Sequence, residues 1–410
     1  MARFKNKNSI SWKIKKFIKN WILIDLLALI YFILESFYRK NPNRILFFFG
    51  KEEAFADNSR VLFEYMQNKA DNELVLFIYR KELYLQLKEL YPENTLYAYS
   101  LNGLICFLKS RIIILSYGTD KLYFFPYYLN LRYKTVIQLW HGSLFKRLGF
   151  QVTGWNKIKG KKELQKFSKF IACSSLERFM ISSCFNMHID DIWITDYPRN
   201  DKLFQTNKQI INEFPYLDKK VILYAPTWRE EGRKTVFFPF EDVNLKIIQS
   251  FLEETDSYLL IRTHREEMDN FRKIHEISFQ ESNRIIGAGR EIFPHTEDLL
   301  PYVDILITDY SGIYNDFLLL NRPIIFIPYD IDDYSTYRGV LFDYNKFTAG
   351  PKITSQKHFL TEIQSYYDNW DKDKELRVEM QKTFHDNIDG NACERILLKL
   401  KTHINYFKDS

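Results

Sequence analysis

Short hydrophobic runs alternate with longer amphipathic stretches along most of the chain. The runs are rich in Ile, Leu, Val and Phe, and the stretches between them carry apolar residues at helical spacing. Short, wholly hydrophobic strands separated by helices are typical of a parallel sheet covered on both faces. We expect strands at residues 45–49, 74–79, 112–115, 136–139, 170–173, 192–195, 221–225, 258–261, 284–286, 305–308 and 324–327.

A polar stretch between Pro198 and Pro215 divides these strands into two groups. Two groups of strands that alternate with helices predict two doubly wound α/β domains, joined near residues 197–215. A last helical pattern at residues 392–406 has no strand after it, and we expect it to pack back on the first domain. The predicted units are an N-terminal segment, two domains and a C-terminal helical segment, at residues 1–43, 44–205, 206–385 and 386–410.

The N-terminal segment has the pattern of a basic amphipathic helix. Apolar residues such as Ile14, Phe17 and Trp21 share one helical face, and the other carries Lys13, Lys15, Lys16 and Lys19. The apolar stretch at residues 21–34 is shorter than the roughly 17 to 25 residues of a membrane span, and no small-residue cleavage site follows it. We expect a retained helix on an anionic membrane surface; the alternative is a helix packed on the protein's own core.

Charge is concentrated in the same segment. The chain carries 58 Lys and Arg against 52 Asp and Glu, a formal net charge of +6, but residues 1–20 hold seven of the basic residues and no acidic one. The remainder is nearly neutral, and since nucleic-acid binding needs a basic face on the folded domain, we expect no nucleic-acid partner. The four cysteines form no CxxC pair, which predicts reduced, buried thiols rather than a zinc site or disulfides.

Polar residues directly after a strand are the candidates for chemistry, because ligands of open α/β sheets bind beyond the carboxyl ends of the strands. The run at 136–139 continues into Trp140-His141-Gly142-Ser143, where His141 could act as a general base. In the second domain, Arg262-Thr263-His264-Arg265 concentrates positive charge suited to a phosphate. The alternatives are a structural histidine at a turn and an ordinary polar surface turn.

Two further strand ends have candidate phosphate-binding residues. Thr308-Asp309-Tyr310-Ser311-Gly312 leads from a strand into a helical pattern at residues 313–320, and such a turn offers backbone N–H groups to an anion. Its alternative role is helix capping. Ala225-Pro226-Thr227-Trp228-Arg229 leaves another strand, and Arg229 could clamp a phosphate.

Together these segments resemble the CDP-glycerol glycerophosphotransferase family of teichoic-acid and capsule synthesis. The resemblance covers about residues 44–400 and rests on the order of Trp140-His141-Gly142 with Lys146, Ala225-Pro226-Thr227-Trp228-Arg229, Arg262-Thr263-His264, Thr308-Asp309-Tyr310-Ser311 and Arg338-Gly339, with Asp57-Asn58-Ser59 and Tyr197-Pro198-Arg199-Asn200-Asp201 besides. The chain departs from the family at Asp196, where Gly is frequent, at Gly312, where a second Ser is usual, and at Ser143-Leu144 in place of Thr-Pro.

The resemblance implies a GT-B-like fold of two Rossmann-type domains with the active site between them. It also implies transfer of glycerol phosphate, or a related alditol phosphate, from CDP-glycerol to a hydroxyl of a lipid-linked acceptor, with release of CMP. His141 and His264 are then the expected catalytic residues. The expected donor-binding residues are Thr227, Arg229, Arg262, Thr308, Asp309, Ser311, Gly312 and Arg338, and the expected acceptor-side residues are Gly142, Ser143 and Lys146.

No cofactor is evident from the sequence, and no metal site is expected. The expected location is peripheral, on the cytoplasmic face of the cell membrane. Two other classes stay open: a GT-B glycosyltransferase that uses a nucleotide sugar, and a nucleotide-binding scaffold at the membrane without turnover.

Overall fold

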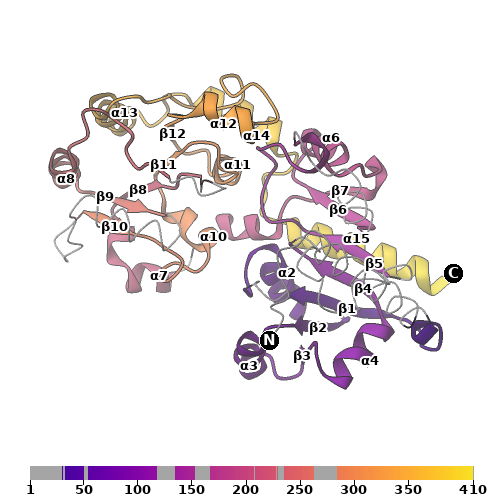
Figure 1. The fold of residues 1–410 in the computed structure, drawn as a ribbon. Helices are drawn as coiled ribbons and strands as arrows, with labels where there is room; N and C mark the ends of the chain where they lie inside the picture. The colour runs from indigo at the N-terminus through magenta and orange to yellow at the C-terminus, as the bar shows by residue number, and fades with distance from the viewer. Residues whose placement is uncertain are drawn as a thin grey trace, which may run out of the picture.

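Seven parallel strands form the sheet of the first lobe, in the order β3-β2-β1-β4-β5-β6-β7 (Figure 1). The computed structural model describes residues 30, 33–49, 54–117, 134–152, 167–206, 208–227, 229, 235–262 and 284–409. The strands are β1 (Asn41–Phe49), β2 (Glu73–Ile78), β3 (Thr95–Tyr97), β4 (Ser110–Leu115), β5 (Thr135–Gln138), β6 (Lys169–Ala172) and β7 (Ile192–Ile194). Between them run α2 (Asp57–Gln67), α3 (Lys81–Leu90), α4 (Leu101–Lys109), η3 (Gly149–Gln151), α6 (Ser175–Phe185) and η4 (Ile189–Asp191).

Five parallel strands form the sheet of the second lobe, in the order β10-β9-β8-β11-β12. They are β8 (Lys220–Tyr224), β9 (Ser257–Ile261), β10 (Ile285–Gly287), β11 (Ile305–Thr308) and β12 (Ile324–Phe326). The segment η5 (Pro198–Phe204) leads from β7 towards this lobe. The other elements are α7 (Lys208–Glu213), η6 (Pro215–Asp218), α8 (Leu245–Glu254), α10 (Thr296–Leu299), η7 (Leu300–Tyr302), α11 (Ile313–Leu318), α12 (Ile331–Tyr337), α13 (Gln356–Asp368), α14 (Lys374–Phe384) and α15 (Ala392–Asp409).

The predicted fold class, α/β with two parallel sheets, is confirmed. Each of the eleven predicted strands is present, and β3 is an addition that the hydrophobic pattern did not reveal. The helix α11 ends at Leu318, two residues before the predicted end. The sheets lie within residues 41–194 and 220–326, on either side of the predicted junction, while the exact domain boundaries stay a prediction.

The C-terminal helix α15 lies against the first lobe, where Figure 1 shows it in yellow beside the strands. Ile396, Leu400 and Ile404 join the hydrophobic core that β1 and α2 form. The helix begins where the carboxylate of Asp201 accepts hydrogen bonds from the backbone N–H groups of Ala392 (2.8 Å) and Cys393 (2.9 Å). A residue of η5 therefore caps the helix that returns from the second lobe.

The predicted amphipathic helix lies mostly outside the described residues. In the part that is described, the carboxylate of Glu35 is buried and pairs with Lys40 and with Lys134, the latter at 2.9 Å. Burial lowers the pKa of Lys134 to about 8. Among the helices of the described ranges, none combines the length and the apolar character that a membrane crossing requires.

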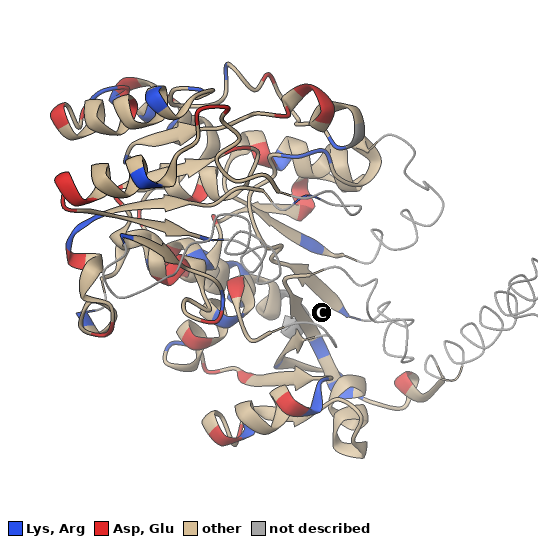
Figure 2. Ribbon diagram, turned by 60° about the vertical axis from the view of Figure 1, so that its left-hand side comes forward, with Lys and Arg blue, Asp and Glu red and all other residues tan. Residues whose placement is uncertain are grey.

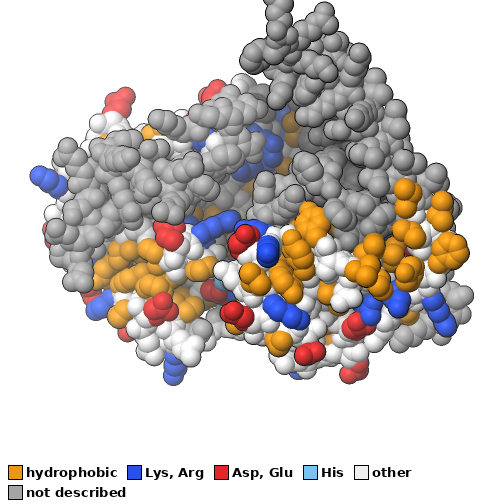
Figure 3. All heavy atoms as spheres, turned by 60° about the horizontal axis from the view of Figure 1, so that its bottom comes forward, with side chains coloured by type: hydrophobic (Ala, Val, Ile, Leu, Met, Phe, Trp, Pro, Cys, Tyr) orange, Lys and Arg blue, Asp and Glu red, His pale blue; other side chains and the backbone are white. Residues whose placement is uncertain are grey.

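The surface carries both signs of charge on both lobes. Figure 2 shows Lys and Arg interspersed with Asp and Glu over the helices of the described part of the chain. On the face that Figure 3 shows, hydrophobic side chains form groups with charged side chains around them. All four cysteines are buried and unpaired, as predicted.

Candidate active site

A cavity of about 450 Å³ lies between the two lobes, a volume within the usual range of small-molecule sites. Its wall combines the loop after β5, the start of η5, the ends of β8 and β9, α10 and the turn before α11. The polar residues of the wall include His141, Ser143, Lys146, Arg199, Asn200, Arg262, Thr296, Glu297, Ser311, Asp316 and Arg338.

His141 follows β5 and is exposed to this cavity. Its Nδ1 lies 3.1 Å from the backbone carbonyl oxygen of Ser116. A carbonyl oxygen can only accept, so Nδ1 carries the proton and Nε2 keeps a free lone pair. The ring stacks on Tyr117 at 5.0 Å and also contacts Trp140. The surrounding protein lowers the pKa of His141, so the imidazole is neutral near pH 7 and Nε2 is able to accept a proton.

Hydrogen bonds to the backbone fix the loop that carries His141. The side-chain amide of Asn58 donates to the carbonyl oxygens of Leu139 and Trp140, both at 3.0 Å. Trp140 has a φ of +55°, and Gly142 a φ of +147° that other residues rarely adopt. The strand therefore ends in a turn whose conformation is imposed by its neighbours.

Arg262 brings a positive charge to the opposite side of the cavity. Its guanidinium donates to the backbone carbonyl oxygens of Ala288 (2.8 Å) and Phe293 (3.0 Å) and to the hydroxyl of Thr296 (3.0 Å). Among the described carboxylates, none lies within ion-pair distance of it. Burial lowers the pKa of Arg262 to about 10, which still leaves it charged near pH 7. A cation held by neutral acceptors can pair with a phosphate.

Ser311 and Gly312 lie at the start of α11 and line the same cavity. A Cβ atom on Gly312 would lie 3.1 Å from the carbonyl oxygen of Ser143, so the turn before α11 approaches the loop after β5 closely. The helix has six residues, so its dipole is small, and contacts from Ser311 and the backbone carry more weight than a helix end.

Backbone pairing joins the lobes beside the cavity. Lys146 and Val340 form an isolated antiparallel bridge, the N–H of Arg147 donates to Gly339 (3.1 Å), and the N–H of Leu341 donates to Phe145 (3.1 Å). Among the predicted residues, Gly142, Ser143 and Lys146 therefore lie where the first lobe meets the second, and Arg338 lines the cavity next to this pairing.

Four predicted donor-binding residues lie beside the cavity wall, and three of them, Thr227, Arg229 and Asp309, bond to one another. Arg229 is buried, and its guanidinium pairs with Asp309 (2.9 Å) and with Asp330 (2.8 Å). Asp309 also accepts from the N–H of Thr227, and the hydroxyl of Thr308 donates to the carbonyl oxygen of Ala225. These contacts tie the ends of β8 and β11 together, while the donor-binding roles of the four residues stay predictions.

His264, the second expected catalytic residue, lies outside the described residues, as does Trp228. Sequence reasoning gave no role to other residues of the cavity wall, notably Arg199, Glu297 and Asp316. For Arg199 a signal existed, because Tyr197-Pro198-Arg199-Asn200-Asp201 was part of the family resemblance. Glu297 and Asp316 lie within helices and stood in no motif.

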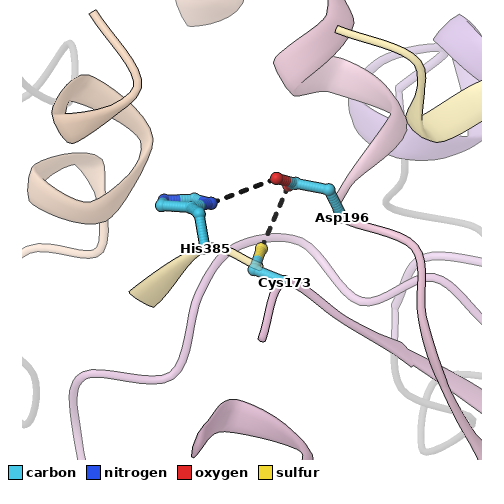
Figure 4. A group of neighbouring side chains, drawn as sticks. All are labelled: Cys173, Asp196 and His385. Atoms are coloured by element: carbon cyan, nitrogen blue, oxygen red, sulfur yellow. Dashed lines mark hydrogen bonds and ion pairs between the residues drawn. The ribbon is translucent and has the colours of Figure 1, made fainter. Parts of the chain in front are cut away.

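A buried group of three side chains, Cys173, Asp196 and His385, lies at the junction of the lobes (Figure 4). His385 Nδ1 lies 3.1 Å from one carboxylate oxygen of Asp196, and the thiol of Cys173 donates to the other at 3.2 Å. His385 Nε2 lies 2.8 Å from the carbonyl oxygen of Asn315 in α11. Their donor atoms lie close enough for a metal ion, yet hydrogen bonds account for these contacts.

The protonation states of this group follow from its contacts. Burial is the largest single cause and lowers the pKa of His385, but the Asp196 carboxylate, the Asn315 carbonyl and Asp316 together raise it. Both ring nitrogens face acceptors, so His385 donates from both and carries a positive charge. Burial raises the pKa of the Cys173 thiol well above its usual value, so this cysteine is a hydrogen-bond donor rather than a thiolate.

The family model of the CDP-glycerol:poly(glycerophosphate) glycerophosphotransferases matches residues 30–401. A teichoic acid glycerol-phosphate transferase of Staphylococcus aureus is 28% identical over 386 residues, which cover 87% of this chain and 93% of that protein. A teichoic acid poly(ribitol-phosphate) polymerase of Bacillus spizizenii is 31% identical over 303 residues, 71% of this chain. The match spans 46% of that polymerase, so about half of its length lies outside the match.

Solved structures share the fold. The wall teichoic acid polymerase TagF superposes with a TM-score of 0.66 at 22% identity, covering 96% of this chain and 97% of that chain. A UDP-GlcNAc 2-epimerase of Neisseria meningitidis superposes with a TM-score of 0.53 at 14% identity, covering 88% of this chain and 99% of that chain. The two-lobed GT-B-like architecture is thus the expected one.

Proposed function

The chain belongs to the CDP-glycerol:poly(glycerophosphate) glycerophosphotransferase family, and from this premise we propose that it transfers glycerol phosphate, or a related alditol phosphate, from a CDP-alditol to a hydroxyl of a lipid-linked acceptor. The acceptor oxygen attacks the β-phosphorus of the donor. A new P–O bond forms, the bond between the β-phosphorus and the bridging oxygen breaks, and CMP leaves with that oxygen. The product is a phosphodiester of the kind from which teichoic acids are built.

His141 is the general base of this proposal. The observation that carries it is the contact of Nδ1 with the Ser116 carbonyl, which leaves Nε2 unprotonated at the wall of the cavity between the lobes. Nε2 takes the proton of the acceptor hydroxyl as the P–O bond forms. A positioned base of this kind contributes on the order of 10² to 10⁴ in rate.

The second lobe supplies the charge that holds the diphosphate. Arg262 and Arg338 offer positive charge, and Ser311 and the backbone of Gly312 offer hydrogen-bond donors close to the His141 loop. Such groups stabilise the charge that spreads over the phosphoryl oxygens in the transition state. His264 is proposed to act there as well, and Lys146 with Ser143 on the acceptor side.

The test is release of CMP from CDP-glycerol in the presence of a synthetic lipid-linked disaccharide. CDP-ribitol and several nucleotide sugars are supplied separately, so a glycosyltransferase would be recognised by the nucleotide it releases. We expect the turnover of His141→Asn to fall by a factor of about 10² to 10⁴. Donor binding, measured by calorimetry, should change little. Near-normal turnover of this variant would show that His141 is not the base.

Attachment to the membrane is the second part of the proposal. The basic N-terminal segment carries lysines suited to anionic headgroups, and Ile33 and Phe37, which follow it, are exposed. Acceptors built on lipid carriers would be reached from such a position at the cytoplasmic face. The supporting observations are composition and exposure.

Deletion of residues 2–29 tests the attachment. The deletion ends before Glu35, because the buried Lys134 would lose its carboxylate partner in a longer truncation. We expect the truncated protein to release from anionic vesicles, and replacement of Lys13, Lys15, Lys16 and Lys19 by Gln to weaken binding in a salt-dependent way. Unchanged sedimentation of both variants with vesicles would refute the attachment.

A further inference from the structure

Arg199 lies at the start of η5, in the wall of the cavity, and is mostly buried. Its backbone N–H donates to the side-chain oxygen of Asn58 at 3.1 Å. The same Asn58 holds the carbonyl oxygens of Leu139 and Trp140, so the backbone of Arg199 and the His141 loop share one anchor.

The guanidinium of Arg199 joins three separate elements. Its Nη1 donates to Asp57 of α2 (2.8 Å) and to the backbone carbonyl oxygen of His141 (2.9 Å). Its Nη2 donates to the carboxylate of Asp316 of α11 at 2.5 Å. The first two acceptors belong to the first lobe, and the third belongs to the second lobe. One planar, rigid group thus bonds directly to both sides of the cavity.

On the first side, the contact fixes the residue proposed as the base. Gly142 has no side chain, and a Cβ atom there would lie 2.9 Å from Arg199 Nη2, so the guanidinium packs directly on the loop backbone. Asp57, which Arg199 holds on one carboxylate oxygen, accepts on the other from the hydroxyl of Tyr117 at 3.0 Å. Tyr117 in turn stacks on the imidazole of His141.

On the second side, the contact fixes the helix that follows the proposed diphosphate-binding turn. Asp316 lies about one turn after Gly312 in α11. It is buried, and its other carboxylate oxygen has no hydrogen-bond partner in the described part of the chain. Arg199 is therefore the side chain that donates to Asp316, and it links the position of α11 to that of the His141 loop.

We propose that Arg199 is a positioning residue of the transfer reaction, which sets the place of the His141 imidazole relative to the Ser311–Gly312 turn. This inference rests on the proposed function, because it takes His141 to be the general base and the Ser311–Gly312 turn to bind the diphosphate. An ion pair with a purely structural role would need the contact with Asp316 but no bond to the backbone of His141.

The inference also predicts an electrostatic effect on His141. The ionisable groups that face its ring are Asp57 of α2, Arg199 of η5 and Tyr117 after β4. Burial is the main cause that lowers the pKa of His141; Asp57 opposes it, and the positive charge of Arg199 lowers the pKa further. Removal of the guanidinium therefore raises the pKa of His141, both directly and because Asp57 loses its partner.

The experiment compares Arg199→Lys, Arg199→Gln and Asp316→Asn with wild type in the CMP-release assay. Since a displacement of about 1 Å can cost on the order of 10² in rate, we expect kcat to fall about 10- to 100-fold in each variant. The KM for CDP-glycerol should stay within about threefold. In Arg199→Gln the acidic limb of the kcat profile should move to higher pH, because the base becomes protonated more readily.

Arg60→Gln is the matched control. Arg60 also joins the lobes, through Glu297 (2.9 Å) and Asp298 (3.2 Å), but within the described part of the chain it forms no hydrogen bond or ion pair with the His141 loop. We expect its kcat within about threefold of wild type and an unshifted acidic limb. The positioning role would be overturned if Arg60→Gln and Arg199→Gln lost the same share of kcat. It would also be overturned if the kcat of Arg199→Lys exceeded half of the wild-type value.

The proposed function is wrong if wild type releases no nucleotide from any donor and acceptor, and this outcome is distinct from failure of the positioning role. The positioning role is then tested by NMR titration of the histidine rings, with His141 assigned from His141→Asn. Arg199→Gln should raise the pKa of His141 and Arg60→Gln should leave it unchanged, whereas equal pKa values in all three proteins would overturn the inference. Thermal unfolding of each variant shows that it is folded, and Arg199→Met, which also removes the charge, replaces Arg199→Gln if the latter is not folded.

Discussion

Three non-glycine residues near the junction of the lobes have a positive φ: Asp57 (+59°), Trp140 (+55°) and Asp196 (+66°). Such backbone conformations cost about 1 to 2 kcal/mol each for residues with a Cβ atom. Each is held by side-chain contacts that a relaxed backbone would break: Asp57 by Arg199, Trp140 by Asn58, and Asp196 by His385. The side chains that bond across the junction of the lobes therefore also hold these three backbone conformations.

The lowered pKa of the His141 imidazole predicts how turnover depends on pH. The base works in its neutral form, so activity is lost as pH falls through the pKa of His141. Because burial lowers that pKa, the acidic limb of the kcat profile should lie below about pH 6.5. Stopped-flow or steady-state CMP release across the pH range measures it. An acidic limb clearly above this value would assign the titration to another group.

At Arg229 the structure predicts a large loss of stability on substitution. Its guanidinium is buried between Asp309 and Asp330, so Arg229→Met leaves a buried carboxylate without its partner. We expect a loss of about 3 to 5 kcal/mol in the free energy of unfolding, measured with urea. If Arg229 instead acted mainly as a phosphate clamp, Arg229→Lys would raise the donor KM and leave the unfolding midpoint unchanged.

Single residues at strand ends were the part of the site that the sequence could predict. His141 and Arg262 stood directly after hydrophobic runs, and both line the cavity. The partners of Arg199 were not visible, because Asp57 and Asp316 lie 142 and 117 positions away in the sequence. The ion pairs of Arg229 were not visible for the same reason, because its partners Asp309 and Asp330 lie 80 and 101 positions away.

At the scale of elements, the cap of α15 makes a separate prediction. Asp201 accepts from the first two N–H groups of the helix, and Asp201→Ala should cost about 1 to 2 kcal/mol of stability. Asp201→Asn keeps one acceptor oxygen and should cost less. Urea unfolding measures both, and hydrogen exchange of the amides of Ala392 and Cys393 should accelerate in Asp201→Ala. Unchanged exchange there would show that the cap does not stabilise the helix.

Long hydrophobic runs predicted the elements well, and short or mixed ones did not. The strand β3 has three residues, Thr95–Tyr97, two of which are only half-buried at the edge of the sheet, so no hydrophobic run marks it. The helix α11 stops at Leu318 although its apolar pattern continues, because the chain turns at Asn321, with a φ of +49°, before β12. Tertiary packing decided both boundaries.

At the scale of the whole molecule, the lobes are joined by a buried ion pair whose strength depends on pH. His385 follows α14, bonds to Asp196 of the first lobe and to α11 of the second, and also faces Asp316, Cys173 and Glu177. Its pKa is raised in the folded state, so its contribution to stability is fully present below about pH 6.5 and is lost as pH rises through the folded value. Asp196, whose pKa is lowered, loses its contribution only in acid.

Asp196→Gly tests this ion pair. The substitution relieves the positive φ but leaves His385 buried without its carboxylate, so burial lowers its pKa. The free energy of unfolding of wild type should fall between about pH 6 and about pH 8. In the variant it should fall less, or rise, over the same interval. Urea unfolding at both values gives the difference. Parallel pH curves for the two proteins would exclude a charged His385.

The return of α15 to the first lobe also constrains how the protein is made. A ribosome releases the chain from its N-terminal end, and domains commonly fold as they emerge. Here the core of the first lobe includes Ile396, Leu400 and Ile404, so it stays incomplete until the second lobe and α15 have been translated. Nascent chains stopped before residue 392 should therefore show a protease-sensitive first lobe that becomes resistant only when those last turns are added.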